Sequence, residues 1–381
     1  MKKINLVIFG ATGSIGKSVL SIVRSNRDKF NIQGITCNKN QKKLIKIANE
    51  FNVKNIGINK NINEKGRQLN KFNIFHGIET FNSIIDNKTD IIIFAISGLS
   101  GLDLVLKLIK LGKKIGFANK ECIISLGKNL YKQAYTHSTQ IIPLDSEHNS
   151  IYHLLNNNHN SFESITITAS GGPFRKLPLK AFKKITKKQA LFHPIWKMGA
   201  KISVDSATMV NKALEIMEAK YLFNLNDNQI NAVIHPQAIV HAMINYKNGI
   251  TTALMNKPDM RIPISSLFFE FDKYSKRNKS FNILNYSNLE FFDIDPIKFP
   301  AIKIGRDVMK TGGLAPNAFN YLNEILVRHF IKGSIKFLDI VYLNEANLEK
   351  IFAKNSNIMN PKLDDIRNIN NWIDKNIFLG Q

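Results

Sequence analysis

The chain has little cysteine and no long hydrophobic run, and both absences limit what the protein can be. Its two cysteines among 381 residues, Cys37 and Cys122, cannot build a disulfide framework and match no metal-ligand spacing, so a reducing compartment fits best. No stretch approaches the roughly eighteen uninterrupted apolar residues of a membrane-spanning helix. Residues 4–9 follow two lysines, but this apolar run is too short for a signal peptide and breaks at Gly10. We therefore expect a cytoplasmic protein.

Acidic residues are also scarce. The chain has 29 Asp and Glu against 53 Lys and Arg, which gives a formal net charge of +24. Such a charge is typical of proteins that bind nucleic acid or anionic membranes. However, the lysines are spread along the chain in the company of many Asn, Ile and Phe, residues with AT-rich codons, which suggests base-composition drift. Because no long block of like charges and no basic-aromatic recognition pattern occurs, we expect no nucleic acid and no membrane as partners. Nucleic-acid binding stays open as the weaker alternative.

What the sequence does contain is an alternation of short apolar runs with helical periodicity over its first 140 residues. The content of 44% hydrophobic and 22% charged residues is that of a globular protein, with length for two or three domains. The alternation is typical of βαβ units and predicts a doubly wound, Rossmann-like parallel sheet. The expected strands are residues 4–9, 32–36, 55–58, 90–95, 114–117 and 140–143.

The pattern changes after residue 145, which predicts further domains. Polar and apolar residues alternate from Glu163 to Thr168, residues 270–300 show no sustained period, and helical spacing returns with Phe319, Leu322, Leu326 and Phe330. The fold class is therefore α/β, with a central α+β domain and a C-terminal α-helical domain. We expect a nucleotide-binding domain at 1–144, a catalytic domain at 145–269, a linker at 270–297 and a helical domain at 298–381.

A glycine-rich turn follows the first expected strand. Gly10, Gly13 and Gly16 lie between this strand and a helix that runs to about residue 24, with Thr12 at the usual middle glycine position. Glycines here permit a tight turn, a close approach of backbone N–H groups to a pyrophosphate and close helix packing. The alternative is a tight turn with no ligand. The position of the glycine-rich turn after the first strand of a βαβ series favours a dinucleotide site.

The end of the second expected strand indicates which dinucleotide is bound. NAD sites usually place an acid there for the ribose 2′-hydroxyl, whereas Cys37-Asn38-Lys39-Asn40 contains none. Lys39 instead offers a cation for a 2′-phosphate. Lys39 could also be one of the many lysines that reflect base composition alone. The lack of an acid still makes NADP a better prediction than NAD.

Asp145 and Glu147 follow the last strand of the expected sheet. In open α/β sheets ligands bind at the carboxyl ends of strands, and two residues of spacing on an extended backbone direct both carboxylates to one face. Hard oxygen ligands suit Mg²⁺ or Mn²⁺. A solvated surface pair is the alternative when this motif is taken by itself.

A second segment strengthens the prediction of a ligand site. Asn211, Lys212 and Glu215 share one side of an expected helix and could bind a phosphate and complete a metal shell. The alternative is an exposed Lys/Glu pair of little energetic weight. Between the two segments, residues 170–199 have glycines at both ends and an apolar centre with an exposed Trp196, as a closing lid requires. His193 in this lid could donate to a phosphate or satisfy a local carbonyl.

Seven motifs, taken together and in order, resemble one enzyme family over residues 1 to about 350. They are G-A-T-G-S-I-G (10–16), A-N-K-E (118–121), L-D-S-E-H-N (144–149), S-G-G-P-F-R (170–175), H-P-x-W-x-M-G (193–199), K-I-S-V-D-S-A-T-M-x-N-K-x-L-E (201–215) and I-H-P-Q (234–237). The sequence is thereby identified as similar to the 1-deoxy-D-xylulose 5-phosphate reductoisomerases. Several of these strings are long and chemically unusual, so the combination is highly specific.

The resemblance implies a role for each matching residue. The implied metal ligands are Asp145, Glu147 and Glu215, which together with Lys120 are the implied catalytic residues. The implied substrate-binding residues are Lys120, Ser146, Glu147, Ser170, His193, Trp196, Ser206, Asn211, Lys212 and Glu215, with His241 in support. The implied cofactor-binding residues are Gly10, Thr12, Gly13, Ser14, Ile15, Lys39, Asn40, Asn119, Glu121 and Gly199.

The implied reaction is an NADPH-dependent rearrangement and reduction of 1-deoxy-D-xylulose 5-phosphate to 2-C-methyl-D-erythritol 4-phosphate, a step of isoprenoid precursor biosynthesis by the non-mevalonate pathway. A divalent cation, Mg²⁺ or Mn²⁺, and a homodimer are implied as well. Another NADP-linked dehydrogenase, such as a semialdehyde type, is the competing enzyme class. Two departures from the family pattern stand out: Asn38 replaces a glycine, and Tyr321-Leu322 replaces two alanines.

Overall fold

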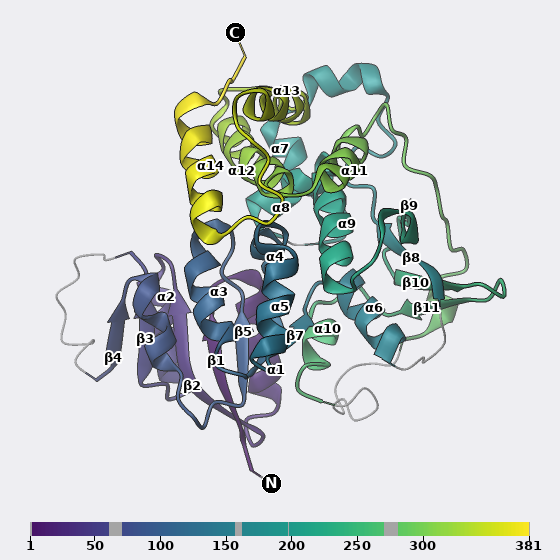
Figure 1. Cartoon of the computed structure of the whole chain (residues 1–381). Helices are drawn as coiled ribbons and strands as arrows, with labels where there is room; N and C mark the ends of the chain where they lie inside the picture. The colour runs from purple at the N-terminus through teal and green to yellow at the C-terminus, as the bar shows by residue number, and fades with distance from the viewer. Residues whose placement is uncertain (1, 61–70, 157–161, 197, 270–280, 381) are drawn as a thin grey trace. The chain divides into compact units, whose positions relative to one another are not determined.

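The computed structural model of the protein describes residues 2–60, 71–156, 162–196, 198–269 and 281–380 (Figure 1). The chain divides into two compact units. Unit 1 comprises Met1–Cys122, Asn129–Tyr152 and Asp259–Lys279, and unit 2 comprises Ile123–Lys128, His153–Pro258 and Ser280–Gln381. Among the residues described, no helix combines the length and the apolar character needed to cross a membrane.

Unit 1 is built on a seven-stranded sheet in the order β4-β3-β2-β1-β5-β6-β7, in which all pairings are parallel. The chain proceeds outward from β1 to β4, then returns to the other side of β1 with β5. The point where the order reverses, between β1 and β5, is where α/β sheets of this kind bind ligands. The strands are β1 Ile4–Phe9, β2 Phe30–Cys37, β3 Asn55–Ile58, β4 Asn73–His76, β5 Ile91–Phe94, β6 Lys114–Phe117 and β7 Gln140–Pro143.

The helices of unit 1 bury apolar stripes against this sheet. Helix α1 (Ser14–Ser25) buries Val19, Leu20 and Val23 in one core with Leu6 of β1. The short helix α10 (Arg261–Ser265) comes from much later in the sequence and packs on α1. The remaining elements are α2 Gln41–Glu50, η1 Ile78–Ile84, η2 Leu99–Gly101, α3 Leu102–Ile109, α5 Lys128–Thr136, and the beginnings of α4 Lys120–Leu126 and α6 Ser146–Asn156.

Unit 2 combines a four-stranded sheet with a group of helices. The sheet has the order β11-β10-β8-β9 and is mixed, because β8 pairs with β9 in parallel and with β10 antiparallel. Helix α12 is central to the helices, and it packs against α8, α11, α13 and α14 (Figure 1). The elements are β8 Phe162–Ala169, η3 Leu179–Lys184, α7 Lys187–Ala190, α8 Ala200–Ala207, α9 Val210–Leu222, η4 Asp227–Gln229, β9 Ile230–Ile234, β10 Val240–Tyr246, β11 Thr251–Met255, η5 Ile283–Asn285, α11 Ala301–Thr311, α12 Ala315–Lys332, α13 Asp339–Lys354 and α14 Leu363–Asn376.

The predicted α/β class and the six predicted strands are confirmed, but the chain divides differently from the predicted domains. Residues 145–152 and 259–269 belong to unit 1, since α6 begins directly after β7 and α10 returns to α1. The C-terminal helices belong to the same unit as the β8 sheet, because α11 packs on α9 and α12 on α8. Of the predicted linker, residues 270–280 lie outside the described part; the rest is irregular apart from η5 and a bridge between Phe292 and Ile234.

Both departures from the family pattern make hydrogen bonds within the protein. The Asn38 side chain accepts one from Asn59 Nδ2 at 3.2 Å, and its backbone is not in the left-handed region, so a side chain is accommodated there without strain. The Tyr321 hydroxyl donates to Asp374 Oδ2 at 2.7 Å and links α12 to α14. Burial and this carboxylate raise the pKa of Tyr321. Leu322 is fully buried in the same helix.

Candidate functional site

The glycine-rich turn after β1 lies at the point where the strand order reverses. Gly10 has φ +89°, and a Cβ on it would lie 2.3 Å from the Ala95 carbonyl oxygen at the end of β5. A Cβ on Gly16 would lie 2.5 Å from the Gly10 carbonyl oxygen, so this glycine allows α1 to pack on the turn. Gly13 caps α1, and Ser14 and Ile15 begin it. The N-terminus of α1 therefore offers backbone N–H groups and a partial positive charge to an anion.

Asn119 organises the neighbouring loop. Its buried side-chain amide donates to the carbonyl oxygens of Ile96 and Gly98, the latter at 2.9 Å, and accepts from the Cys122 N–H at 2.6 Å. The loop after β5 and the start of α4 are thereby held together. Lys120 and Glu121 follow in the first turn of α4, and Glu121 is buried.

The carboxylates of Asp145 and Glu147 lie at the beginning of a helix. The Asn149 N–H donates to the Asp145 carbonyl oxygen at 2.8 Å, and α6 starts at Ser146. The prediction of an extended backbone here was wrong, because β7 ends at Pro143 and helical hydrogen bonding begins two residues later. The positive end of α6 instead stabilises negative charge. Lys120 Nζ lies 2.8 Å from Asp145 Oδ2, and the Ser146 hydroxyl donates to Glu147 Oε2 at 2.6 Å.

In unit 2, Asn211, Lys212 and Glu215 form a buried cluster on α9. Asn211 Nδ2 donates to Glu215 Oε1, and Lys212 Nζ is paired with Glu215 Oε2. Lys212 and Glu215 are 3% and 2% exposed, so this is not a solvated surface pair. The predicted placement of the three side chains on one side of a helix is confirmed. Lys212 also donates to the Thr168 carbonyl oxygen near the end of β8.

The residues after β8 gather beside this cluster. His193 Nε2 lies 3.0 Å from Ser170 Oγ, and its Nδ1 accepts the backbone N–H groups of Ile195 and Trp196 at 3.2 and 2.9 Å. Since Nδ1 is an acceptor, the neutral ring carries its proton on Nε2 and donates toward Ser170. Gly172 has φ +64°, and a Cβ on it would lie 2.8 Å from the Ser206 carbonyl oxygen. The backbone at Ser206 therefore packs closely against the turn that follows Ser170, whose hydroxyl lies beside His193.

We expect His193 to make stability fall in mild acid. Burial lowers the pKa of His193 from 6.5 to about 4. In the unfolded chain His193 is protonated below about pH 6.5, whereas in the folded protein it stays neutral down to about pH 4. The contribution of the neutral ring to the free energy of unfolding is therefore complete above pH 6.5 and is lost as the pH falls from 6.5 to 4. Relative to His193→Gln, the wild-type protein should lose roughly 1 to 3 kcal/mol between pH 7 and pH 4. Urea unfolding of both proteins across this range checks the result, and parallel pH profiles would contradict it.

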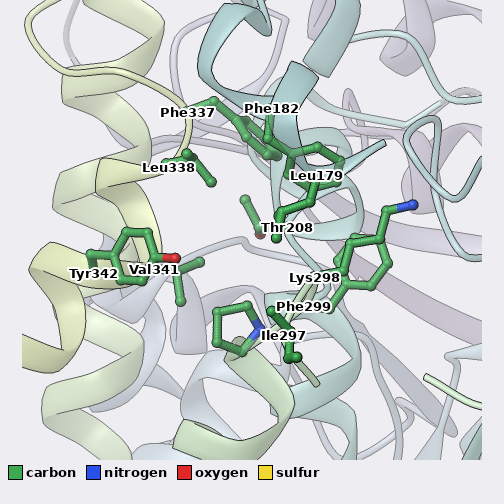
Figure 2. Close-up of a pocket in the computed structure, with 11 residues that line it drawn as sticks. Leu179, Phe182, Thr208, Ile297, Lys298, Phe299, Phe337, Leu338, Val341 and Tyr342 are labelled. Atoms are coloured by element: carbon green, nitrogen blue, oxygen red, sulfur yellow. The ribbon is translucent and has the colours of Figure 1, made fainter. Parts of the chain in front are cut away.

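The predicted lid, residues 170–199, includes a segment that packs firmly within unit 2. Its 3₁₀ helix η3 contributes Leu179 and Phe182 to an apolar pocket in unit 2, together with Phe299 and Phe337 (Figure 2). The Phe182 and Phe337 rings pack edge to face with centroids 6.0 Å apart. This pocket contains none of the predicted site residues. Among the described residues of the predicted lid, those that line this pocket lie in η3.

Trp196 and the glycines at the two ends of the predicted lid differ in part from the prediction. Trp196 is half-buried rather than exposed, with its ring centroid 6.4 Å from that of His241, which is itself buried. Gly171 and Gly172 have positive φ as hinges often do, whereas Gly199 has φ −68° and caps α8. Lys39 and Asn40 are exposed after β2, where Asn40 caps α2.

Sequence reasoning missed two groups in unit 2, one that links α8 to α12 and one that binds Lys212. Asp205 is 1% exposed and accepts from Lys201 Nζ at 2.8 Å and from Asn323 Nδ2 at 2.7 Å, which ties α8 to α12. The available signal was the spacing of Lys201 and Asp205, which places an oppositely charged pair four residues apart on a helix. The Thr168 carbonyl oxygen, which binds Lys212, is a backbone group and has no signal in the sequence.

A parallel sheet with a glycine-rich turn at its switch point, together with buried groups suited to an anionic substrate, defines a dinucleotide-dependent enzyme. Comparison with known proteins specifies the family. The family model described as 1-deoxy-D-xylulose 5-phosphate reductoisomerase matches residues 6–127, and two models of reductoisomerase C-terminal domains match residues 141–223 and 255–376. The chain belongs to the 1-deoxy-D-xylulose 5-phosphate reductoisomerase family.

Individual relatives extend over the whole chain. The reductoisomerase of Pelagibacter ubique (strain HTCC1062) is 42% identical, with 98% of each chain covered. Among solved structures, a reductoisomerase in complex with NADPH, fosmidomycin and magnesium is 32% identical with a TM-score of 0.88, covering 98% of this chain and 97% of that one. The Zymomonas mobilis enzyme in complex with NADPH is 32% identical with a TM-score of 0.87, covering 97% of each chain.

Proposed function

We propose that the protein converts 1-deoxy-D-xylulose 5-phosphate to 2-C-methyl-D-erythritol 4-phosphate with NADPH and a divalent cation, in the formation of isoprenoid precursors. The observation that carries this proposal is the similarity over nearly the full chain to reductoisomerases, 42% identity in the case of the Pelagibacter ubique protein. The buried α9 cluster supports it, because an ammonium group held at 3% exposure beside a carboxylate at 2% suits an anionic substrate group and a cation.

The proposed metal ligands are Asp145, Glu147 and Glu215. All three are carboxylates, which are the hard oxygen ligands that Mg²⁺ and Mn²⁺ prefer, so the donor set fits the cation. Lys120 and Lys212 balance the charges of Asp145 and Glu215 in the structure. When bound, the cation supplies a Lewis acid that stabilises negative charge on substrate oxygens.

The chain's own residues then orient the substrate. We propose that Ser170, His193, Ser206, Asn211 and Lys212 bind its phosphate. His193 is suited to this as a neutral donor through Nε2–H, since two backbone N–H groups fix its tautomer. Ser146 and Glu147 would bind the substrate hydroxyls, and Lys120 Nζ, held beside Asp145, would move protons at the reacting oxygens.

The cofactor residues are proposed from the geometry around the glycine-rich turn. Gly10, Thr12, Gly13, Ser14 and Ile15 would hold the pyrophosphate at the N-terminus of α1, and Lys39 and Asn40 the adenosine 2′-phosphate. Asn119, Glu121 and Gly199 would contact the nicotinamide half of NADPH. Asn119 also holds the loop after β5 through its hydrogen bonds to Ile96 and Gly98. Trp196, backed by His241, would cover the substrate and exclude water when the lid closes. A homodimer and a cytoplasmic location complete the proposal.

The function is tested by following NADPH absorbance with deoxyxylulose phosphate as substrate. We expect oxidation of NADPH in the presence of Mn²⁺ or Mg²⁺, its loss in excess EDTA, and its recovery when the cation is restored in excess. The product should be identified by mass spectrometry, because a different dehydrogenase would oxidise NADPH without rearranging the carbon skeleton. Consumption that persists in EDTA, or a product with an unbranched skeleton, would contradict the proposal.

A further inference from the structure

Two lysines outside the predicted site meet beside the glycine-rich turn. Lys43, on the first turn of α2, donates from Nζ to the Thr12 carbonyl oxygen at 3.0 Å. Lys17, on α1, is near enough to Lys43 for its positive charge to contribute to a lowered pKa of the Lys43 amine. Two helices of unit 1 therefore bring two ammonium groups to the turn that is proposed to bind the cofactor.

This pairing of like charges is unfavourable without an anion. In the part of the chain that the structure describes, neither amine lies within ion-pairing distance of a carboxylate. Partial burial lowers the pKa of Lys43, and the nearby Lys17 ammonium lowers it further. A phosphate bound at this point would offset the repulsion between the two amines and could accept charge-assisted hydrogen bonds from them.

The position of the pair indicates which anion fits. Helix α2 begins directly after β2, and Asn40 caps it by accepting the Lys43 N–H at 3.1 Å. In dinucleotide-binding sheets the adenosine 2′ position lies at the end of this second strand, close to the glycine-rich turn. The segment after β2 contains no acid to bind a 2′-hydroxyl, and Lys39 is four residues before Lys43. A phosphomonoester at the 2′ position would be surrounded by cations from two helices and a loop.

We propose that Lys43, supported by Lys17, determines the preference of the enzyme for NADPH over NADH by binding the 2′-phosphate, an inference that rests on the proposed function. Lys43 has two roles in this binding. Its hydrogen bond to Thr12 fixes the amine beside the turn, and its charge is neutralised when the dianionic phosphate binds. Lys17 adds a second hydrogen-bond donor and a second positive charge, which strengthen the binding of the phosphate.

The test compares two small probes, 2′,5′-ADP and 5′-AMP, which differ by the 2′-phosphate alone. Their affinities are measured by calorimetry for the wild type, Lys43→Met, Lys17→Met and the charge-preserving Lys43→Arg. Lys46→Met, at an exposed position one turn further along α2, is the control for net charge. We expect Lys43→Met to weaken 2′,5′-ADP roughly 10- to 100-fold and leave 5′-AMP within about twofold. Lys17→Met should show a smaller loss, Lys43→Arg should retain most of the discrimination, and Lys46→Met should resemble the wild type.

The KM values for NADPH and NADH in turnover give a second readout. The KM for NADPH should rise in Lys43→Met while that for NADH stays unchanged. Equal weakening of both probes would overturn the inference, because it would show that Lys43 only supports the turn through Thr12. Unchanged binding of both probes would overturn it as well. If the wild type fails to turn over deoxyxylulose phosphate yet still prefers 2′,5′-ADP through Lys43, the proposed reaction fails and the cofactor inference stands.

Discussion

The Glu147→Gln protein is expected to fold normally and to lose nearly all turnover. Glutamine keeps the size of the side chain and an oxygen that can accept from the Ser146 hydroxyl, which is 2.6 Å from Glu147 Oε2. It removes the charge that we propose to bind the divalent cation. Because a metal-bound Lewis acid contributes several kcal/mol of transition-state stabilisation, we expect kcat to fall by about 10²- to 10³-fold. Affinity for Mn²⁺, followed by electron paramagnetic resonance, should fall with it.

A matched substitution separates the site from the general loss of a carboxylate. Glu163 is exposed on β8, and Glu163→Gln makes the same chemical change on the surface. This control should keep the turnover, Mn²⁺ affinity and melting temperature of the wild type. Near-normal turnover in Glu147→Gln would remove Glu147 from the proposed ligand set. Loss of turnover with unchanged Mn²⁺ affinity would instead place its role in substrate binding.

Gly10→Ala is expected to destabilise the protein strongly and to abolish NADPH binding. The backbone of Gly10 is left-handed, with φ +89°, and a methyl group would lie 2.3 Å from the Ala95 carbonyl oxygen. The added atom meets backbone just beyond the end of β5 rather than a side chain that can move. Strain and overpacking together should lower the free energy of unfolding by about 3 kcal/mol or more. Urea denaturation measures the stability, and NADPH fluorescence measures binding.

Gly333→Ala isolates the conformational part of this effect. Gly333 has φ +86°, nearly the same as Gly10, but a Cβ on it would have no neighbouring atom within 4 Å. It lies at the end of α12 in unit 2, whereas the glycine-rich turn belongs to unit 1. We expect a loss of about 1 kcal/mol and unchanged NADPH affinity. If the two variants were destabilised equally, the close approach of the turn to β5 would have no energetic importance.

The strands of unit 1 could be predicted because each is a short apolar run between polar residues. β1, β3, β6 and β7 have the predicted bounds, since a strand buried on both faces needs no alternation to be recognised. β4 was missed. It has four residues, of which the outer two are exposed, and it lies at the edge of the sheet, so little apolar surface marks it in the sequence.

The site could be predicted where its motifs are local. Asn211, Lys212 and Glu215 come together because one helix carries all three, and helical spacing is visible in a sequence. The conformation of Asp145 to Glu147 could not be predicted in the same way. A strand and a helix N-terminus both accept these residues, and the choice depends on the hydrogen bond from the Asn149 N–H to the Asp145 carbonyl oxygen.

By itself, then, the sequence determined the residue types and spacings that mark the family, and with them the chemistry of the carboxylates, glycines and lysines in its motifs. Only the tertiary structure added Lys43 to the lysines that the motifs mark, and only it identified the backbone groups that these lysines bind. Lys212 binds the Thr168 carbonyl oxygen and Lys43 binds that of Thr12. The physical reason is that a backbone carbonyl has no identity in the sequence, so its partner becomes visible only when packing places the two together.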